Sequence, residues 1–374
     1  MTSRERLLAA LKLQPTDRVP INTYELCPHN SQSFENKEPS YRDLMSFIRA
    51  NCDSLTMWNP SGNGVFALSS HPAEIRHTQD TVPDKGLTIN RYSVTAPSGR
   101  VLTWTDQVYQ DVVTTWHTEH ICKTLQDVDD FLSFPYTPIT YDASDYVRIR
   151  EELGDHGLIM ASVGDPLCTA MEIMEFGEAT VWAMTETDHF ESAIKEIHRR
   201  NMINLENMLK AQVVDLYRIC GPEYATPPYL PPRFFERFVV PCVTDMTRLI
   251  HRYGGLVRIH SHGRVGQVLD MILTCGADGI DPCEAPPDGD ISLGELKRRV
   301  AGRLCVFGNL QLKLLERASE NEVRSTVKQC MEEAKEGYGY VIMPTASPIN
   351  IPLAQKTENN YRVFIEAALE YGVY

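Results

Sequence analysis

LVRIHSHG, residues 256–263, is the part of the chain that points most directly to a fold. Its first six residues read as a short strand rich in β-branched side chains, and it ends in a polar cluster closed by a glycine. Residues 264–275 follow with apolar side chains at helical spacing. A strand that ends in polar residues and leads into a helix is the repeating unit of parallel α/β folds.

The same strand-then-helix unit recurs after residue 157. The strand-like runs are 158–163, 214–220, 256–261, 278–281, 304–307 and 340–343, and the helical stretches include 187–211, 232–253, 264–275, 320–336 and 357–371. Two earlier runs, 19–25 and 54–58, bring the expected strands to eight. Eight strands with intervening helices predict an α/β fold of the (β/α)8 TIM barrel type. The alternative is an open doubly wound sheet, but no G-x-G-x-x-G motif follows any strand.

Residues 62–120 follow a different pattern. The segments 74–79, 87–96, 100–106 and 112–122 are rich in Thr, Val, Ile, Tyr and Trp, and Pro97-Ser98-Gly99 marks a turn. This pattern predicts an antiparallel β meander inserted into the barrel. No Gly/Ser-rich linker divides the chain. We therefore expect residues 1–374 to form a single barrel domain that carries 62–120 as a β-rich insertion.

Composition argues against several classes of protein. The chain has 374 residues and a formal net charge of −14, whereas nucleic-acid-binding proteins present a basic face. Its 10 cysteines include no C-x-x-C pair, which favours buried thiols in a reducing compartment. The N-terminal residues lack the apolar core of a signal peptide, and no apolar run is long enough to span a membrane. We therefore expect a cytoplasmic protein with neither nucleic acid nor membrane as a partner.

Two histidines stand at the end of the 256–261 run. His260 and His262 are two residues apart, so on a strand both imidazoles point to the same side. Glu223, after the neighbouring strand, is the best third ligand for a metal ion and is also a candidate acid or base. In the alternative interpretation, one histidine caps a helix or binds a carbonyl group and the other is solvated.

Charged residues follow the same and the next strand. Arg258 shares the side of His260, and an inward arginine needs a carboxylate, such as Asp215 or Asp281, or an anionic ligand. Asp281 and Glu284 are candidates for acid–base catalysis, although a carboxylate pair in a loop also serves to cap the next helix.

Three further polar residues end other strands. Glu25 ends the run 19–25, Asp165 follows 158–163, and the Asn309 amide would donate to a bound oxygen. Active sites of such barrels lie where the carboxyl ends of the strands meet. We expect Glu25, Asp165 and Asn309 to bind substrate together with Arg258.

Several short motifs, taken together, resemble the uroporphyrinogen decarboxylase superfamily. They read RER (4–6), DRVP (17–20), GPEY (221–224), HSHG (260–263), GADG (276–279) and GN (308–309), and the helix around 234–241 also fits. The resemblance implies a (β/α)8 barrel and one of two activities. One branch of the superfamily decarboxylates the acetate arms of uroporphyrinogen without a cofactor, and the other comprises zinc methyltransferases that work with a corrinoid protein.

The chain departs from both branches. The decarboxylases bind substrate carboxylates through paired arginines near the N-terminus, but residues 22–29 read NTYELCPH and hold no arginine. The methyltransferases bind zinc through His-x-Cys after strand 5 and through a second Cys after strand 8. Here these positions read His260-x-His262 and Thr345-Ala346-Ser347, so both thiolates are missing. A harder N/O site of His260, His262 and Glu223 is what remains for zinc or another divalent ion.

With these departures, the resemblance favours the corrinoid-linked methyltransferase branch. It implies transfer of a methyl group between a corrinoid protein and either a small methoxy, amine or thiol substrate or a tetrahydrofolate-like acceptor. The D-x-H-x-x-G pattern of cobalamin-binding modules is absent, so the corrinoid must arrive on a partner protein. The metal would act as a Lewis acid, and Asp281, Glu284 or Tyr224 would donate a proton. Family analogy alone raises the option of a homodimer.

Two other functions stay open. In a cofactor-free decarboxylase or lyase, Arg258 would bind a small carboxylate and Asp165 or Asp281 would protonate the carbanion. In a non-catalytic member, the same pocket would bind a ligand or a partner.

Overall fold

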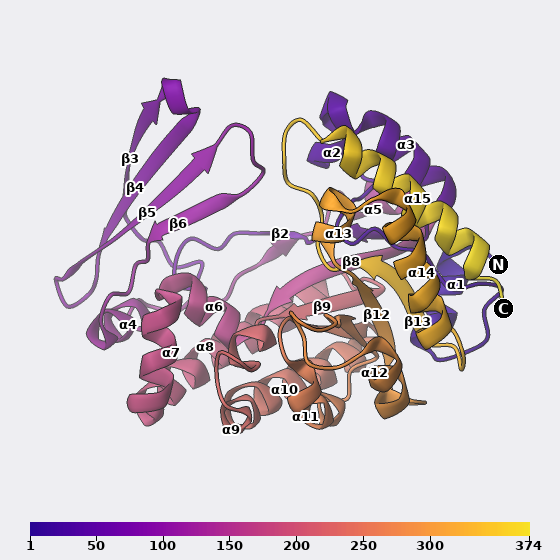
Figure 1. Ribbon diagram of the computed structural model, residues 1–374. Helices are drawn as coiled ribbons and strands as arrows, with labels where there is room; N and C mark the ends of the chain where they lie inside the picture. The colour runs from indigo at the N-terminus through magenta and orange to yellow at the C-terminus, as the bar shows by residue number, and fades with distance from the viewer.

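A parallel sheet of seven strands, curled upon itself, lies at the centre of the computed structural model, which describes residues 1–374 (Figure 1). The strands pair in the order β1-β8-β9-β10-β11-β12-β13. They are β1 (Ser54–Met57), β8 (Gly157–Gly164), β9 (Leu216–Cys220), β10 (Leu256–Ser261), β11 (Gly279–Pro282), β12 (Cys305–Leu310) and β13 (Tyr340–Pro344). Each run predicted after residue 157 overlaps one of these strands, so the α/β class and the parallel sheet are confirmed.

Most helices lie around the outer face of the curled sheet, whereas α1 (Ser3–Leu11) packs at its amino-terminal end (Figure 1). The other helices are α2 (Phe34–Lys37), α3 (Arg42–Asn51), α4 (Leu125–Leu132), α5 (Tyr146–Leu153), α6 (Pro166–Ile173), α7 (Phe176–Thr185), α8 (Thr187–Ala211), α9 (Pro232–Phe234), α10 (Val240–Tyr253), α11 (Leu269–Thr274), α12 (Leu293–Val300), α13 (Leu312–Arg317), α14 (Glu320–Ala334) and α15 (Gln355–Tyr371). A π-helical turn, Phe235–Val239, joins α9 to α10. No helix is both long and apolar enough to cross a membrane.

The predicted first strand does not form. Within 19–25 only Ile21 pairs with the sheet, through a single bridge to Ile342 of β13, so the expected eight-stranded barrel is not closed. Two residues explain the difference. Pro20 has no N–H to give to a ladder, and Tyr24 adopts a left-handed backbone conformation with φ of 61°.

Asp53 holds this irregular segment in place. Its fully buried carboxylate accepts the Ile21 N–H at 2.8 Å and pairs with Arg6 at 2.6 Å and Arg18 at 2.7 Å. The Ile21 carbonyl accepts the Asp53 N–H at 2.7 Å. The segment therefore lies between β13 and β1, where the eighth strand of a barrel would be.

The predicted antiparallel meander is present. β3 (Ile75–Val82), β4 (Leu87–Thr95), β5 (Val101–Tyr109) and β6 (Thr115–Glu119) form a sheet in chain order that stands beside the curled sheet in Figure 1. Two short strands, β2 (Ser61–Gly62) and β7 (Tyr141–Asp142), pair near the start and end of this excursion. Residues 111–113 hydrogen-bond to residues 349–351, which follow β13. The meander therefore contacts the end of the sheet at which the strands terminate.

The inside of the curled sheet is apolar at its amino-terminal end. Leu7 and Leu11 of α1 pack there with residues from the beginnings of the strands, among them Leu158, Leu216 and Cys305. Another, larger apolar cluster lies between the sheet and the surrounding helices. The charged inward residues are found further along the strands, toward their carboxyl ends.

Candidate active site

Two buried arginines, a buried histidine and a buried aspartate lie on β9, β10 and β11. In the strand register Arg218 stands opposite Arg258, and His260 stands opposite Asp281. Alternation along β10 places Arg258 and His260 on the same side of the sheet, as expected from the sequence. The carboxyl ends of these three strands thus bring two arginines, a histidine and a carboxylate together.

Asp281 lies between Arg258 and His260. Its fully buried carboxylate is 2.9 Å from Arg258 Nε and 2.9 Å from His260 Nδ1. Burial alone would raise the Asp281 pKa, but Arg258 and His260 outweigh burial and lower the pKa to about 2. Asp281 is therefore ionised at neutral pH and orients His260 instead of supplying a proton. Asp215, the other partner considered for Arg258, pairs with Arg4 at 2.5 Å.

A second histidine–carboxylate pair lies beside the first. His262 Nδ1 is 3.1 Å from Glu284 Oε1, and Glu284 Oε2 accepts the Gly263 N–H at 3.0 Å. Burial alone would lower the His262 pKa, but Glu284 outweighs burial and the pKa is raised. The His260 and His262 rings meet edge to face with centroids 4.7 Å apart. In both pairs Nδ1 contacts the carboxylate, which leaves Nε2 for a bound molecule.

The three predicted metal ligands do not assemble into a metal-holding group. Glu223 follows β9, and its Oε2 accepts the Gly221 N–H at 2.8 Å within its own loop. His260 and His262 are each paired with a carboxylate. No three His, Cys, Asp or Glu side chains of the chain are placed so that they could hold a metal ion. The residues present therefore do not fit the zinc or other divalent ion expected from the sequence.

Asp165 caps a helix. Its carboxylate is fully buried, and Oδ1 accepts the Cys168 N–H at 2.9 Å in the first turn of α6. Gly221 is required beside it, because a Cβ at that position would lie 1.8 Å from Asp165 Oδ1. Burial raises the Asp165 pKa well above its ordinary value. On this geometry Asp165 joins the ends of β8 and β9 and caps α6, while its Oδ2 atom has no hydrogen-bond partner.

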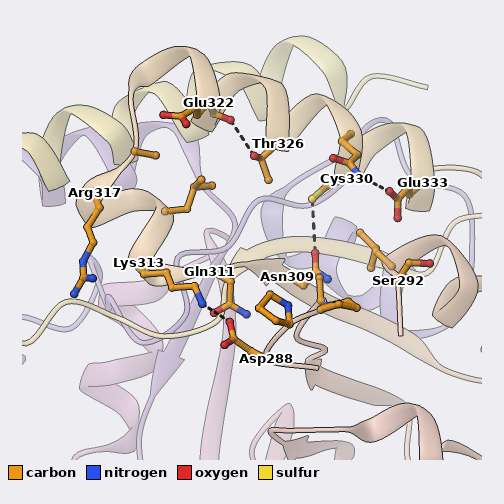
Figure 2. A pocket seen from close by; sticks show the side chains of 17 residues that line it. Asp288, Ser292, Asn309, Gln311, Lys313, Arg317, Glu322, Thr326, Cys330 and Glu333 are labelled. Carbon is orange, nitrogen blue, oxygen red and sulfur yellow. Dashed lines mark hydrogen bonds and ion pairs between the residues drawn. The ribbon is translucent and has the colours of Figure 1, made fainter. Parts of the chain in front are cut away.

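Asn309 is separate from the histidine pairs. Its Nδ2 donates to the Cys283 carbonyl at 2.8 Å, and its Oδ1 is 3.7 Å from Cys330 Sγ of α14. Asn309 and Gln311 line a cavity of about 650 Å³ that is bounded by α12, α13 and α14 (Figure 2). The preceding Gly308 has φ of 150°, which breaks the alternation of side chains along β12. That break turns Asn309 toward α14.

Glu25 reaches the charged group through Arg218. Arg218 Nη2 is 2.5 Å from Glu25 Oε1, and the Arg218 guanidinium lies over the Tyr24 ring at 5.4 Å. Tyr224, in contrast, lies beside Phe176 with ring centroids 5.9 Å apart. Burial raises the Tyr224 pKa, so this phenol keeps its proton at neutral pH.

Sequence reasoning does not single out Arg218 or Cys220. Both share the side of Leu216, whose side chain packs inside the curled sheet. Cys220 Sγ lies 3.4 Å from Ser162 Oγ of β8. The signal that could have found Arg218 is the one that found Arg258, namely a charged residue at an inward position of an apolar run.

A sequence profile described as uroporphyrinogen decarboxylase (URO-D) matches residues 109–371, which is well over half of the chain. The chain belongs to the uroporphyrinogen decarboxylase family. The matched residues include all strands from β8 to β13 and both histidine–carboxylate pairs.

Two proteins similar to this chain are named as methyltransferases. A methylcobamide:CoM methyltransferase, MtaA, from Methanosarcina barkeri is 23% identical over 162 residues, which are 43% of this chain and 45% of that protein. The match thus spans less than half the length of that relative. A methyltransferase structure from Methanosarcina mazei is 17% identical, covers 99% of both chains and has a TM-score of 0.63, so the fold is shared. These findings confirm the expected resemblance and make the chain an enzyme of this family.

Proposed function

We propose that this enzyme moves a methyl group between a corrinoid protein and a small molecule. The small molecule is a methoxy, amine or thiol compound, or a tetrahydrofolate-like acceptor. The pairs His260–Asp281 and His262–Glu284, side by side at the strand ends, are the observation that carries the proposal. The methyltransferase relatives support methyl transfer, and residues 22–29 lack the arginines that a polycarboxylate substrate would need.

His262 is suited to move a proton during this reaction. When a methyl group leaves an ether, the C–O bond breaks, the electron pair stays on the oxygen, and a proton must reach that oxygen. The corrinoid of the partner protein supplies the cobalt that takes or gives the methyl group. Glu284 stabilises protonated His262, so His262 Nε2 can donate to the leaving oxygen and, in the reverse direction, accept a proton from a thiol or amine.

Asp281 and His260 serve as positioning groups. The ionised Asp281 holds His260 by Nδ1, so Nε2 is the nitrogen that meets a bound molecule. This arrangement replaces the metal assistance expected from the sequence, for which the residues present do not form a ligand group. Metal analysis separates the two mechanisms. One equivalent of bound divalent ion, with activity lost on chelation, would restore the metal mechanism.

A cofactor-free decarboxylase is the second candidate. The observation in its favour is the buried pair Arg218 and Arg258, since guanidinium groups bind carboxylates well. Against it, Asp281 is ionised and so holds no proton for a carbanion, and the Asp165 carboxyl group is fully buried where it caps α6. Release of CO2 from a small carboxylate, without any corrinoid protein, would favour this function over methyl transfer.

The proposed activity is tested by incubation with a methylated corrinoid protein and a series of acceptors, followed through the cobalt absorption spectrum. We expect the spectrum to change with at least one acceptor. We also propose that residues 1–374 act as one domain, built on the curled sheet with 62–120 as an insertion, so the full chain is the form to assay.

A further inference from the structure

Arg218 is the least satisfied charged group inside the curled sheet. The residue is 7% exposed, yet its Nε and Nη1 atoms are buried without any hydrogen-bond partner. Buried polar groups are normally paired, because water is no longer there to solvate them. The one partner of the Arg218 guanidinium is Glu25, at Nη2. Two of its nitrogens therefore lack an acceptor.

The neighbouring carboxylate, Asp281, does not accept a hydrogen bond from the unpaired nitrogens of Arg218. Asp281 is already engaged by Arg258 and His260, and Arg258 Nε itself has no hydrogen bond of good geometry. Arg258 Nη1 has only the Met343 sulfur, at 3.9 Å. Of the two buried guanidinium groups, only that of Arg258 contacts a buried carboxylate. A site with this excess of buried donors favours an anion.

Glu25 is the partner of Arg218 that a bound anion can displace. Its side chain is 41% exposed, whereas that of Arg218 is 8% exposed. It belongs to the irregular segment that fails to form a strand, next to the left-handed Tyr24. An anion that reached Arg218 would compete with Glu25 for its guanidinium group.

We propose that Arg218 binds a carboxylate of the substrate and that this carboxylate displaces Glu25. The inference rests on the proposed function and narrows its substrate class to small methylated compounds that carry a carboxylate near the methyl-bearing atom. Arg218 thereby fixes one end of the substrate while the histidine pairs face the other.

Methoxyacetate and 2-methoxyethanol are matched probes, since they differ in the carboxylate. Binding of each to the full chain is measured by calorimetry at neutral pH. We expect methoxyacetate to bind at least about tenfold more tightly than 2-methoxyethanol, in line with a charge-assisted bidentate contact. Arg218→Gln should abolish this preference, and Arg218→Lys should keep part of it. Arg199→Gln, which removes an exposed arginine paired with Glu196, is the control and should change nothing.

Glu25→Gln gives the sharpest test, because the direction of its effect on methoxyacetate affinity distinguishes a Glu25 that competes with substrate from one that is only structural. If Glu25 competes with the substrate carboxylate, its removal should tighten methoxyacetate binding several-fold. If the Arg218–Glu25 pair is only structural, Glu25→Gln should leave binding unchanged or weaken it. Equal binding of the two probes, absence of binding by either, or a preference that survives in Arg218→Gln would each overturn the proposal. Circular dichroism of each variant shows whether it is folded. If Arg218→Gln does not fold, the effect of Glu25→Gln on methoxyacetate binding still tests the proposal.

These outcomes are independent of methyl transfer. A carboxylate preference that depends on Arg218, in a protein that never alters a methylated corrinoid, would refute the proposed function and leave the anion site standing. Methyl transfer without any carboxylate preference would support the proposed function and refute the anion site.

Discussion

At the residue scale, the site depends on two carboxylates that fix two imidazole rings. Asp281 and Glu284 each take the Nδ1 side of a histidine, so the orientation of His260 and His262 is set before any substrate binds. The two carboxylates differ in their surroundings. Asp281 is fully buried beside Arg258, whereas Glu284 lies nearer the surface and also accepts a backbone N–H. Their removal should therefore have different consequences.

We predict that Asp281→Asn lowers the free energy of unfolding by about 3 kcal/mol, because Arg258 loses its buried counter-ion. The folded-state pKa of Asp281 lies below the unfolded value, so its contribution is present above about pH 4 and is lost as the pH falls toward 2. Urea unfolding at several pH values measures both effects. Asp245→Asn, at an exposed carboxylate near His198, is the control. An Asp281→Asn variant as stable as the wild type would contradict the assignment of the pair.

His262 should titrate above the ordinary histidine pKa. Glu284 favours the protonated ring more than burial disfavours it, so the protonated form persists to higher pH. A raised pKa means that methyl removal assisted by protonated His262 is supported at low pH and declines as the pH rises through this pKa. NMR titration of the ring, assigned with His262→Gln, measures the midpoint. Glu284→Gln should move the midpoint down, and an unchanged midpoint would argue against the pair.

Much of the site follows from strand parity, which the sequence displays. Residues two apart on a strand share a side, and this rule places Arg258 beside His260. The rule stops at Asn309, because Gly308 has a backbone conformation that reverses the expected side. It also cannot show that His260 and His262 each turn to a carboxylate of another segment instead of to one metal ion. Such pairings depend on the register between strands, which no local pattern specifies.

At the element scale, the strands after residue 157 were predictable because each is a short β-branched run with a helix behind it. The segment 19–25 has the same composition, but Pro20 and the left-handed Tyr24 prevent a ladder. Ion pairs between side chains hold the segment in place of the hydrogen bonds of a strand. Arg6 and Arg18, both in the motifs that resemble the family, converge on Asp53 and hold the segment beside β13.

Asp53→Asn should therefore destabilise the protein by about 3 kcal/mol, since two arginines lose a fully buried partner. Asp17→Asn is a matched control, because Asp17 also pairs with Arg6 but is 43% exposed. Chemical denaturation compares the two variants. A loss for Asp53→Asn no larger than that for Asp17→Asn would show that the buried pairs do not hold this segment.

At the scale of the whole molecule, the meander is tied to the body at two places. The meander is inserted in the chain between β1 and β8, so both of its ends are joined to the body. Residues 111–113 also form backbone hydrogen bonds with residues 349–351. Ties at both ends favour one cooperative unit over two that unfold separately.

This unit can be tested with the four tryptophans. Trp104 and Trp116 lie in the meander, and Trp58 and Trp182 lie outside it. In a variant with Phe at 58 and 182, fluorescence reports the meander and far-ultraviolet circular dichroism reports the whole chain. We predict that the two thermal transitions coincide. A fluorescence transition at clearly lower temperature would show that residues 62–120 form a unit of their own.

Methyl transfer to or from a corrinoid protein is the activity proposed for this enzyme. The most direct measurement mixes the purified full chain with a methylated corrinoid protein and candidate thiol, amine, phenol and tetrahydrofolate acceptors, and records the cobalt absorption. We predict that at least one acceptor removes the methyl group and changes the spectrum, and that His262→Gln slows this change by about a hundredfold, as expected for loss of a general acid or base. Spectra that stay unaltered with every acceptor, and with methylated donors in the reverse direction, would contradict methyl transfer as the activity of this enzyme.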